Sequence, residues 1–250
     1  MISNNQLKLF KSLQQKKFRK EHGLFVAEGD KLAKELLASS FDIEHVVATQ
    51  GWLDKNEPDL SNECIVANAK EMERISGLNS ASEVMVVCKI PDLTFNANML
   101  QGKLSLVLDN IKDPGNLGTI IRIADWFGIA NIICGAETVE AFNPKVVQAT
   151  MGSITRVQVH YTNLVDLLNH NDLNLPTFGA VLGGENIYQQ ELPNNGLIVI
   201  GNESKGISPE LLTLLDYKIS IPSYGDTNGA ESLNAAIATA LICAEFRREL

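Results

Sequence analysis

The chain has 250 residues, of which 45% are hydrophobic and 20% charged, and its formal net charge is -9 at pH 7. This length is enough for one large core or two smaller ones, and we expect two domains. No apolar run approaches the ~20 residues of a membrane helix, and the first residues lack the apolar core of a secretory signal. We therefore expect a cytoplasmic protein with no membrane segment.

The cysteines and histidines exclude the commonest metal and nucleophile patterns. The four cysteines are widely spaced and form no C-x-x-C pair, and the four histidines are equally dispersed. A zinc site needs such residues at short spacing, and a nucleophile is usually activated by a paired histidine. We expect buried reduced thiols, no metal site and no histidine-centred triad.

The charge is distributed unevenly along the chain. Residues 1–34 carry eight Lys or Arg side chains against three acidic ones, whereas the rest of the chain carries 13 against 27. A basic end can dock on phosphate groups while an acidic body keeps a protein in solution. The charge alone is equally consistent with an ordinary solvated helix face.

The first part of the chain predicts a small α/β domain. Residues 2–20 place Leu7, Phe10 and Leu13 on one helical face between cations, which predicts a basic amphipathic helix. A strand, a turn and a helix follow at 25–39, and then come the strand-like runs IEHVVAT, CIVAN and VMVVCKI. The pattern ends near Pro91, so we place a first domain at 1–92 and a linker at 93–102.

From Lys103 to the C-terminus, apolar strands alternate with helices. Helices are expected at 116–127, about 144–151, 163–168, after Ser208, and from about 231 to 248. Nearly uninterrupted apolar strands of this kind predict a parallel sheet covered by helices on both faces. The second domain is thus an α/β domain spanning 103–250.

Polar residues gather where three of these strands end. After the first strand, Asp113-Pro114-Gly115-Asn116 predicts a tight turn with Asn116 as helix cap, and Arg122 lies in the second helical turn. Taken alone, such an arginine is usually just exposed to solvent. Because ligands of α/β sheets bind outside the carboxyl ends of the strands, the clusters together predict a binding crevice.

The second and third clusters allow a structural or a functional interpretation. IGNESKG brings Glu203 to the end of an apolar strand, where it is either a functional carboxylate or a capping group for the next helix. A glycine-rich loop at 224–229 precedes Ser232-Leu233-Asn234, which opens the last helix. Backbone N–H groups there suit an adenosyl or phosphate group, although Ser-x-Asn is also an ordinary helix cap.

Together, DNIKDPGNLGTIIRIADWFGI, LIVIGNESKGIS and the later IPS and ESLNAAIA resemble the three successive motifs of the SpoU family of RNA ribose 2'-O-methyltransferases, within the SPOUT superfamily. The resemblance runs from about Leu104 to the C-terminus. It implies a parallel α/β domain whose C-terminal segment forms a deep trefoil knot. It also implies that the knot binds S-adenosylmethionine and that a homodimer completes the site.

The resemblance assigns roles to particular residues. Arg122 corresponds to the catalytic arginine, Asn110 to the asparagine of the first motif, and Glu203 to the glutamate that orients the arginine. Ser232 and Asn234 correspond to the pair near the reacting ribose. The residues expected at the cofactor are Leu182, Gly183, Gly201, Ile221 and Leu233. Residues 223–231 form a longer loop than the family pattern, with Ser223 in place of a methionine.

The segment FRKEHGLFVAEGDKLAKELL resembles the small substrate-binding domain, similar to some RNA-binding ribosomal proteins, that precedes the methyltransferase domain in several members. The basic residues around it agree with RNA contact. The residues expected to contact RNA are Lys16, Lys17, Arg19, Lys20, Glu28 and Asn116.

We therefore expect an S-adenosylmethionine-dependent 2'-O-methyltransferase that acts on structured RNA, with rRNA favoured over tRNA. The family mechanism makes Arg122 the base, but a guanidinium holds its proton tightly, which favours a role in binding phosphate and stabilising the 2'-oxygen. The alternatives are a non-catalytic RNA-binding relative that keeps the knot, and an unrelated nucleotide-binding α/β protein.

Overall fold

The structure is a computed structural model that describes residues 2–57, 63–225 and 231–248. Its packing divides the chain into two compact units. The first comprises Met1–Asp92 and Glu140–Thr155, and the second comprises Leu93–Val139 and Arg156–Leu250. Among the described residues, none of the helices has the length and the apolar run that a bilayer crossing requires.

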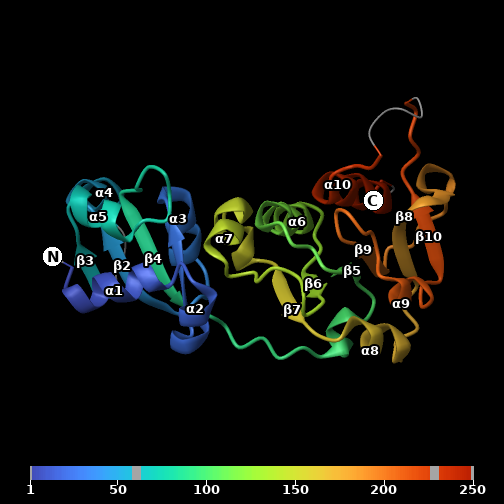
Figure 1. Cartoon of the computed structure of the whole chain (residues 1–250), viewed down its shortest axis with the longest axis horizontal. Helices are drawn as coiled ribbons and strands as arrows, with labels where there is room; N and C mark the ends of the chain where they lie inside the picture. The colour runs from blue at the N-terminus through green and yellow to red at the C-terminus, as the bar shows by residue number, and fades with distance from the viewer. Residues whose placement is uncertain (1, 58–62, 226–230, 249–250) are drawn as a thin grey trace. The chain divides into compact units, whose positions relative to one another are not determined.

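The first unit contains a four-stranded mixed sheet in the order β1-β4-β2-β3 (Figure 1). Its strands are β1 (Leu24–Glu28), β2 (Ile43–Ala48), β3 (Glu63–Val66) and β4 (Val84–Lys89). β4 runs antiparallel to both of its neighbours, and β2 and β3 are parallel. The helices packed with this sheet are α1 (Asn4–Ser12), α2 (Lys16–His22), α3 (Asp30–Leu37), α4 (Gln50–Asn56) and α5 (Ala69–Ile75).

The basic N-terminal segment forms two helices rather than the single one that we expected at 2–20. Ser3 and Gln6 form a capping box that starts α1. The chain leaves helical geometry at Gln15, where φ is -103° and ψ is 133°. The Leu13 carbonyl lies at this break and accepts a hydrogen bond of 2.8 Å from Nη1 of Arg19. The break thus supplies an internal acceptor for an arginine in the next helix.

Residues 140–155 pack with the first unit, although they lie between two strands of the second. Within this segment, α7 (Pro144–Thr150) contacts β1 and is followed by the short 3-10 helix η2 (Ser153–Thr155). Phe142 packs its ring against Phe25 and Phe41, with centroids 4.7 and 6.3 Å away. We expected 103–250 to form one continuous domain, whereas 140–155 pack with the first unit. The chain therefore passes between the two units three times.

The second unit is built on a six-stranded sheet in the order β10-β8-β9-β5-β6-β7, in which every pair of neighbours is parallel. Its strands are β5 (Leu104–Leu108), β6 (Asn131–Cys134), β7 (Gln158–Tyr161), β8 (Thr177–Asn186), β9 (Gly196–Ile200) and β10 (Tyr217–Ser220). Two 3-10 helices also occur, η1 (Ala97–Leu100) and η3 (Ile187–Gln189). The predicted α/β class with a parallel sheet is confirmed.

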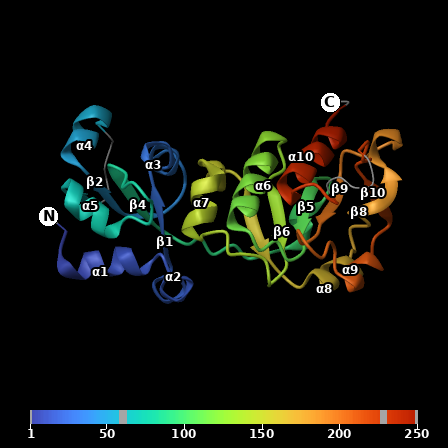
Figure 2. The same ribbon diagram turned by 45° about the horizontal axis from the view of Figure 1, so that its top comes forward.

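Helices cover both faces of this sheet, as Figures 1 and 2 show. α6 (Pro114–Trp126) and α10 (Ala235–Phe246) pack side by side on one face, and α8 (Leu164–Asn169) and α9 (Pro209–Leu212) lie on the other. Val107, Ile133 and Val199 point from the strands toward the α8 and α9 side, where they pack with leucines of these helices. The central strands are therefore buried on both sides.

Two helix starts differ from the sequence prediction because other residues cap them. α6 begins at Pro114, and the carboxylate of Asp113 accepts the N–H of Asn116 at 2.8 Å, so Asp113 rather than Asn116 is the N-cap. α10 begins at Ala235 instead of about 231, because Asn234 is its N-cap.

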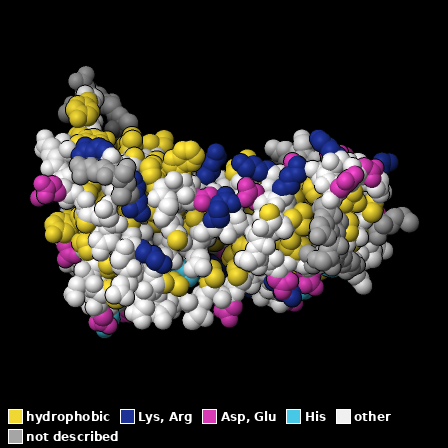
Figure 3. Space-filling view, turned by 180° about the vertical axis from the view of Figure 1, so that it is seen from behind, with side chains coloured by type: hydrophobic (Ala, Val, Ile, Leu, Met, Phe, Trp, Pro, Cys, Tyr) yellow, Lys and Arg dark blue, Asp and Glu magenta, His cyan; other side chains and the backbone are white. Residues whose placement is uncertain are grey.

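The helices α6 and α10 leave large apolar side chains exposed. Ile237 and Leu241, one turn apart on α10, are 55% and 39% exposed, and Trp126 at the end of α6 is 84% exposed. Figure 3 shows apolar side chains gathered over the part of this unit that contains α10. We call Trp126, Ile237 and Leu241 the apolar patch. Exposed patches of this kind mark interaction surfaces.

Candidate active site

The first two polar clusters lie at the carboxyl ends of neighbouring strands. Asp109 and Asn110 follow β5, and the segment 201–206 follows β9, which pairs with β5 in parallel register. Parallel pairing brings these two ends to the same edge of the sheet. The predicted crevice therefore has a structural basis in the order of the strands.

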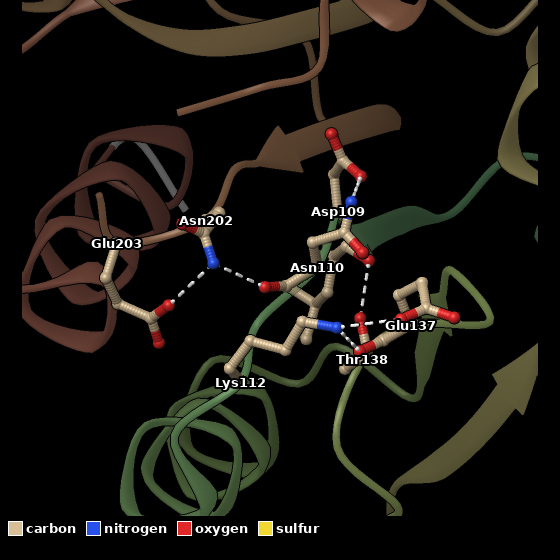
Figure 4. A network of polar contacts seen from close by, with 8 residues as sticks. Asp109, Asn110, Lys112, Glu137, Thr138, Asn202 and Glu203 are labelled. Atoms are coloured by element: carbon tan, nitrogen blue, oxygen red, sulfur yellow. Dashed lines mark hydrogen bonds and ion pairs between the residues drawn. The ribbon is translucent and has the colours of Figure 1, made fainter. Parts of the chain in front are cut away.

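Glu203 is held by two side-chain amides. Its Oε1 accepts a hydrogen bond of 2.9 Å from Nδ2 of Asn116, and its Oε2 accepts one of 3.2 Å from Nδ2 of Asn202. Figure 4 shows the Asn202 amide between Glu203 and the first motif. Both carboxylate oxygens thus have a donor within the protein.

Asn116 connects the three motifs. Its Nδ2 donates to Glu203, and its Oδ1 accepts a hydrogen bond of 2.9 Å from Nδ2 of Asn234. The Oδ1 of Asn234 in turn accepts the N–H groups of Ala236 and Ile237 at the start of α10. Both ends of the half-buried Asn116 amide are thus occupied by side chains of the protein, and its expected contact with RNA stays a prediction.

Arg122 extends from the exposed side of α6. Within the described part of the chain, no hydrogen bond or ion pair reaches its guanidinium. Glu203 therefore contacts Asn116 here, whereas the resemblance implied a contact with Arg122. A guanidinium with five free donors is suited to bind a phosphate group.

Asp109 is a buried carboxylate beneath this network. Its Oδ2 accepts the N–H of Ser208 at 2.6 Å, and its Oδ1 accepts Nδ2 of Asn110 at 2.8 Å. Asn110 itself has a left-handed backbone, with φ of +62°, and its carbonyl accepts Nδ2 of Asn202 at 2.8 Å. The strand ends of β5 and β9 are thus joined through side chains as well as through the sheet (Figure 4).

The residues expected at the cofactor lie in four places: within β8, after β9, after β10 and before α10. Leu182 and Gly183 lie in β8, and Leu182 is 77% exposed. Gly183, with φ of +73°, helps to line an open cavity of about 430 Å³. The other lining residues are Gly184, Glu185, Leu215, Asp216, Tyr217 and Lys218. This volume is within the usual range for small-ligand sites, about 300–1,000 Å³.

Position 201 has no room for a side chain, so only glycine fits there. A Cβ built on it would lie 2.2 Å from the carbonyl carbon of Gly206, so the loop closes only with a glycine there. Ile221 follows β10 and is half-buried, whereas Ser232 and Leu233 are exposed. Of the long loop at 223–231, residues 226–230 lie outside the described part of the chain.

Two of the residues expected to contact RNA are internal. Arg19 is 1% exposed and binds both oxygens of Glu140 at 3.0 Å. Glu28 is also buried, and its carboxylate accepts hydrogen bonds from the Ser76 hydroxyl and the Gly77 N–H. Both predictions are wrong for this structure because the side chains have no surface to offer. The lysines of the set, Lys16, Lys17 and Lys20, are exposed.

Among the described residues, no group of three or more His, Cys, Asp or Glu side chains is arranged to hold a metal ion. Two asparagines hold Glu203: Asn116, which was expected as a helix cap and RNA contact, and Asn202, which sequence reasoning did not single out. A signal for Asn116 was available. It lies in the first turn of a helix that Asp113 already caps, where an asparagine has no capping task.

Comparison with known proteins gives a consistent result for both parts of the chain. The model of the SpoU rRNA Methylase family matches residues 103–244. The model of the MRM3-like substrate binding domain matches residues 4–85.

Similar proteins of known sequence or structure cover the whole chain. The 23S rRNA (guanosine(2553)-2'-O)-methyltransferase RlmP of Bacillus subtilis (strain 168) is 28% identical over 98% of this chain and 96% of its own length. The solved structure of a proposed TrmH-family RNA methyltransferase from Porphyromonas gingivalis is 37% identical, with a TM-score of 0.90 and full coverage of both chains. An AdoMet-bound rRNA methyltransferase from Sinorhizobium meliloti is 29% identical, with a TM-score of 0.86, and covers 100% of this chain and 97% of that one.

The SpoU model spans more than half of the chain, and it includes all three polar clusters joined by the hydrogen bonds described above. The chain belongs to the SpoU rRNA methylase family.

Proposed function

We propose that this chain transfers a methyl group from S-adenosylmethionine to a ribose 2'-hydroxyl of RNA, and that its substrate is rRNA rather than tRNA. The observation that carries the proposal is the chain of hydrogen bonds from Asn234 through Asn116 to Glu203, in which Asn116 lies on the helix that bears the exposed Arg122. The name of the Bacillus subtilis relative, a 23S rRNA methyltransferase of nearly the same length, supports the choice of rRNA.

The residues around Gly183 fit S-adenosylmethionine as cofactor. The cavity beside Gly183 has about 430 Å³, and the neighbouring Leu182 side chain is exposed and apolar, as an adenine ring requires. Gly201, Ile221 and Leu233 complete the proposed set. The bound cofactor supplies an electrophilic methyl group on a sulfonium. The AdoMet-bound relative from Sinorhizobium meliloti supports this assignment.

The protein's own residues align the ribose and manage its proton. Arg122 binds an RNA phosphate and stabilises negative charge developing on the 2'-oxygen. Glu203 acts through Asn116, which fixes the first turn of the helix that carries Arg122. Asn110 holds the adjoining loop, and the exposed Ser232 next to Asn234 positions the ribose or relays the proton.

The two units divide the work. Residues 1–92 form the RNA substrate-binding domain, 93–102 the linker and 103–250 the methyltransferase domain, except that 140–155 pack with the first unit. The match to a substrate binding domain model supports this division. The exposed Lys16, Lys17 and Lys20 are the proposed RNA contacts. A cytoplasmic location stays a prediction of the sequence.

A trefoil knot in the C-terminal part of the methyltransferase domain is also part of the proposal. The C-terminal strand β10 pairs with β8, where a Cβ on Gly184 would lie 2.7 Å from the carbonyl oxygen of Lys218. In addition, α10 follows the edge strand β10 yet packs on α6, which follows the central strand β5. Single-molecule stretching tests the knot, because a knotted chain reaches a shorter extended length than an open one.

A homodimer is proposed because the apolar patch needs a cover. A second copy would bury Trp126 together with Ile237 and Leu241, as is usual for homodimer interfaces. Ile237→Asp should then give a monomer in analytical ultracentrifugation and move the tryptophan emission to longer wavelength. A wild-type monomer at micromolar concentration would contradict the proposal.

Methyl transfer from radiolabelled S-adenosylmethionine to 23S rRNA, 16S rRNA and bulk tRNA tests the function. We expect label in rRNA as 2'-O-methyl nucleotides. Arg122→Ala should abolish turnover while calorimetry shows unchanged cofactor affinity. Cofactor binding without label in any RNA would favour a non-catalytic RNA-binding relative, and label in tRNA alone would overturn the choice of rRNA.

A further inference from the structure

The loop 201–206, which carries Glu203, is organised around the side chain of Asn202. The backbone N–H and carbonyl of Asn202 each pair with Gly206 at 2.9 Å, which closes the loop. Its side-chain Oδ1 accepts the N–H groups of Ser204 and Lys205 at 3.0 and 3.1 Å. The oxygen end of this amide therefore shapes the loop.

The nitrogen end of the same amide points toward the proposed active site. Nδ2 of Asn202 donates to the carbonyl of Asn110 at 2.8 Å and to Oε2 of Glu203 at 3.2 Å (Figure 4). Oε1 of Glu203 is the oxygen that accepts the Asn116 amide. One donor group thus fixes the rotation of the carboxylate and links it to the main chain of the first motif.

The surroundings leave this arrangement little freedom. The loop begins at Gly201, where a Cβ would lie 2.2 Å from the carbonyl carbon of Gly206. It ends near Ser208, whose N–H donates to the buried Asp109 carboxylate. Because both ends of the loop are fixed, the direction of the Glu203 carboxylate depends on its own side-chain contacts. Those on Oε2 come from Asn202.

We propose that Asn202 is a positioning residue for methyl transfer: it holds Oε2 of Glu203 so that Oε1 stays on Asn116. This inference rests on the proposed function. Asn202 touches neither RNA nor cofactor in this role and acts through Glu203. Loss of its donor should reduce kcat by about 10- to 100-fold, the usual effect of a supporting contact that lets a reacting group drift.

Asn202→Asp tests the proposal because it replaces the Nδ2 donor by a carboxylate oxygen in a side chain of nearly the same size and shape. The remaining Oδ1 still accepts the N–H groups of Ser204 and Lys205, so the loop is expected to keep its shape. The second oxygen, however, faces the Glu203 carboxylate and the Asn110 carbonyl, where a donor is needed. We expect a kcat about 10- to 100-fold below wild type at pH 8 and a KM for S-adenosylmethionine within about twofold of wild type.

The pH profile separates positioning from a general structural effect. The charged groups around the new carboxyl are Glu203, which faces it, Asp109 beneath the loop and Lys205 on the loop. Two facing carboxylates share a proton as the pH falls, and the protonated group regains a donor. The ratio of variant to wild-type kcat should therefore rise between pH 8 and pH 6.

Two further variants keep the result interpretable. Ser204→Ala in the same loop is the matched control and should have wild-type kcat. It keeps the backbone N–H that Asn202 accepts, and among the described residues the exposed Ser204 hydroxyl has no hydrogen-bond partner. Asn202→Ser removes the Nδ2 donor without adding a charge, and its kcat should fall by a similar factor. This variant replaces Asn202→Asp in the test if Asn202→Asp does not fold. A wild-type kcat in Asn202→Asp, or an equal loss in Ser204→Ala, would overturn the proposal. Failure of the proposed function itself would be visible separately, as absence of methyl transfer by the wild-type protein.

Discussion

Glu140→Ala removes the partner of a buried arginine and gives the sharpest test of the packing of residues 140–155. Arg19 is 1% exposed, and its Nε and Nη2 donate to the two oxygens of Glu140 at 3.0 Å each. Its Nη1 donates to the Leu13 carbonyl at 2.8 Å. In the variant, the buried guanidinium keeps its hydrogen bond to the Leu13 carbonyl, but Nε and Nη2 lose the carboxylate that accepts their hydrogen bonds.

The expected cost follows from this geometry. Removing one member of a buried ion pair destabilises a protein by about 3–5 kcal/mol, because the other charge stays buried without compensation. The Glu140 side chain is 17% exposed, so water reaches one edge of the pair, and Arg19 keeps one acceptor. We therefore expect the lower end of the range, about 3 kcal/mol.

The chain contains two tryptophans, which lie in different units and make the assay selective. Trp52 is buried in the core of the first unit, so a Trp126→Phe background reports the urea unfolding of that unit through Trp52 alone. Asp42→Ala is the matched control, because it removes the exposed Lys89–Asp42 pair, and solvent-screened pairs of this kind contribute little to stability. Adding Arg19→Met to Glu140→Ala should recover part of the loss. If Glu140→Ala costs no more than Asp42→Ala, the pair does not contribute as described.

Three further outcomes are expected. Gly201→Ala should reduce both cofactor affinity and turnover by at least about tenfold, because its Cβ would lie 2.2 Å from the Gly206 carbonyl carbon. Gly206→Ala is the control: Gly206 has a φ of +69° and open space around it, so this variant should lower the free energy of unfolding in urea by only about 1–2 kcal/mol. Burial lowers the pKa of His160, so as the pH falls below about 6.5 the unfolded chain takes up a proton at this residue before the folded protein does. Between pH 7 and pH 5, the free energy of unfolding should therefore fall more steeply in wild type than in His160→Gln. Parallel curves for the two proteins would contradict this. In filter-binding titrations, the slope of log K against log salt concentration should become shallower by about two when Lys17→Ala and Lys20→Ala are combined. An unchanged slope would mean that neither lysine contacts RNA phosphate.

The sequence pattern predicted the order of strands and helices in the second unit because buried parallel strands are apolar along their whole length. Polar residues at the ends of such strands are visible in a sequence and marked the clusters. The roles expected of Asn110, Glu203 and Asn234 came from the resemblance of these clusters to the SpoU motifs. Their neighbourhood followed from the pairing of β5 with β9.

The partners of these residues were not predictable in the same way. Arg19 lies among exposed lysines, and its partner Glu140 is 121 residues further along the chain, so local periodicity carries no sign of its burial. The Asn116 amide turns toward Glu203 and Asn234 only once α6 and α10 pack together. Helical periodicity gives the face of a residue, and long-range packing decides what that face meets.

The three passages of the chain between the units make the N-terminal unit a discontinuous domain. Cleavage in the linker would leave it attached through 140–155, so limited proteolysis there should yield two fragments that elute together. A truncation at residue 92 would expose Phe25 and Phe41 and leave Arg19 buried without Glu140. Anyone grafting this unit onto another enzyme must therefore transplant two separate segments, because neither one is the whole module.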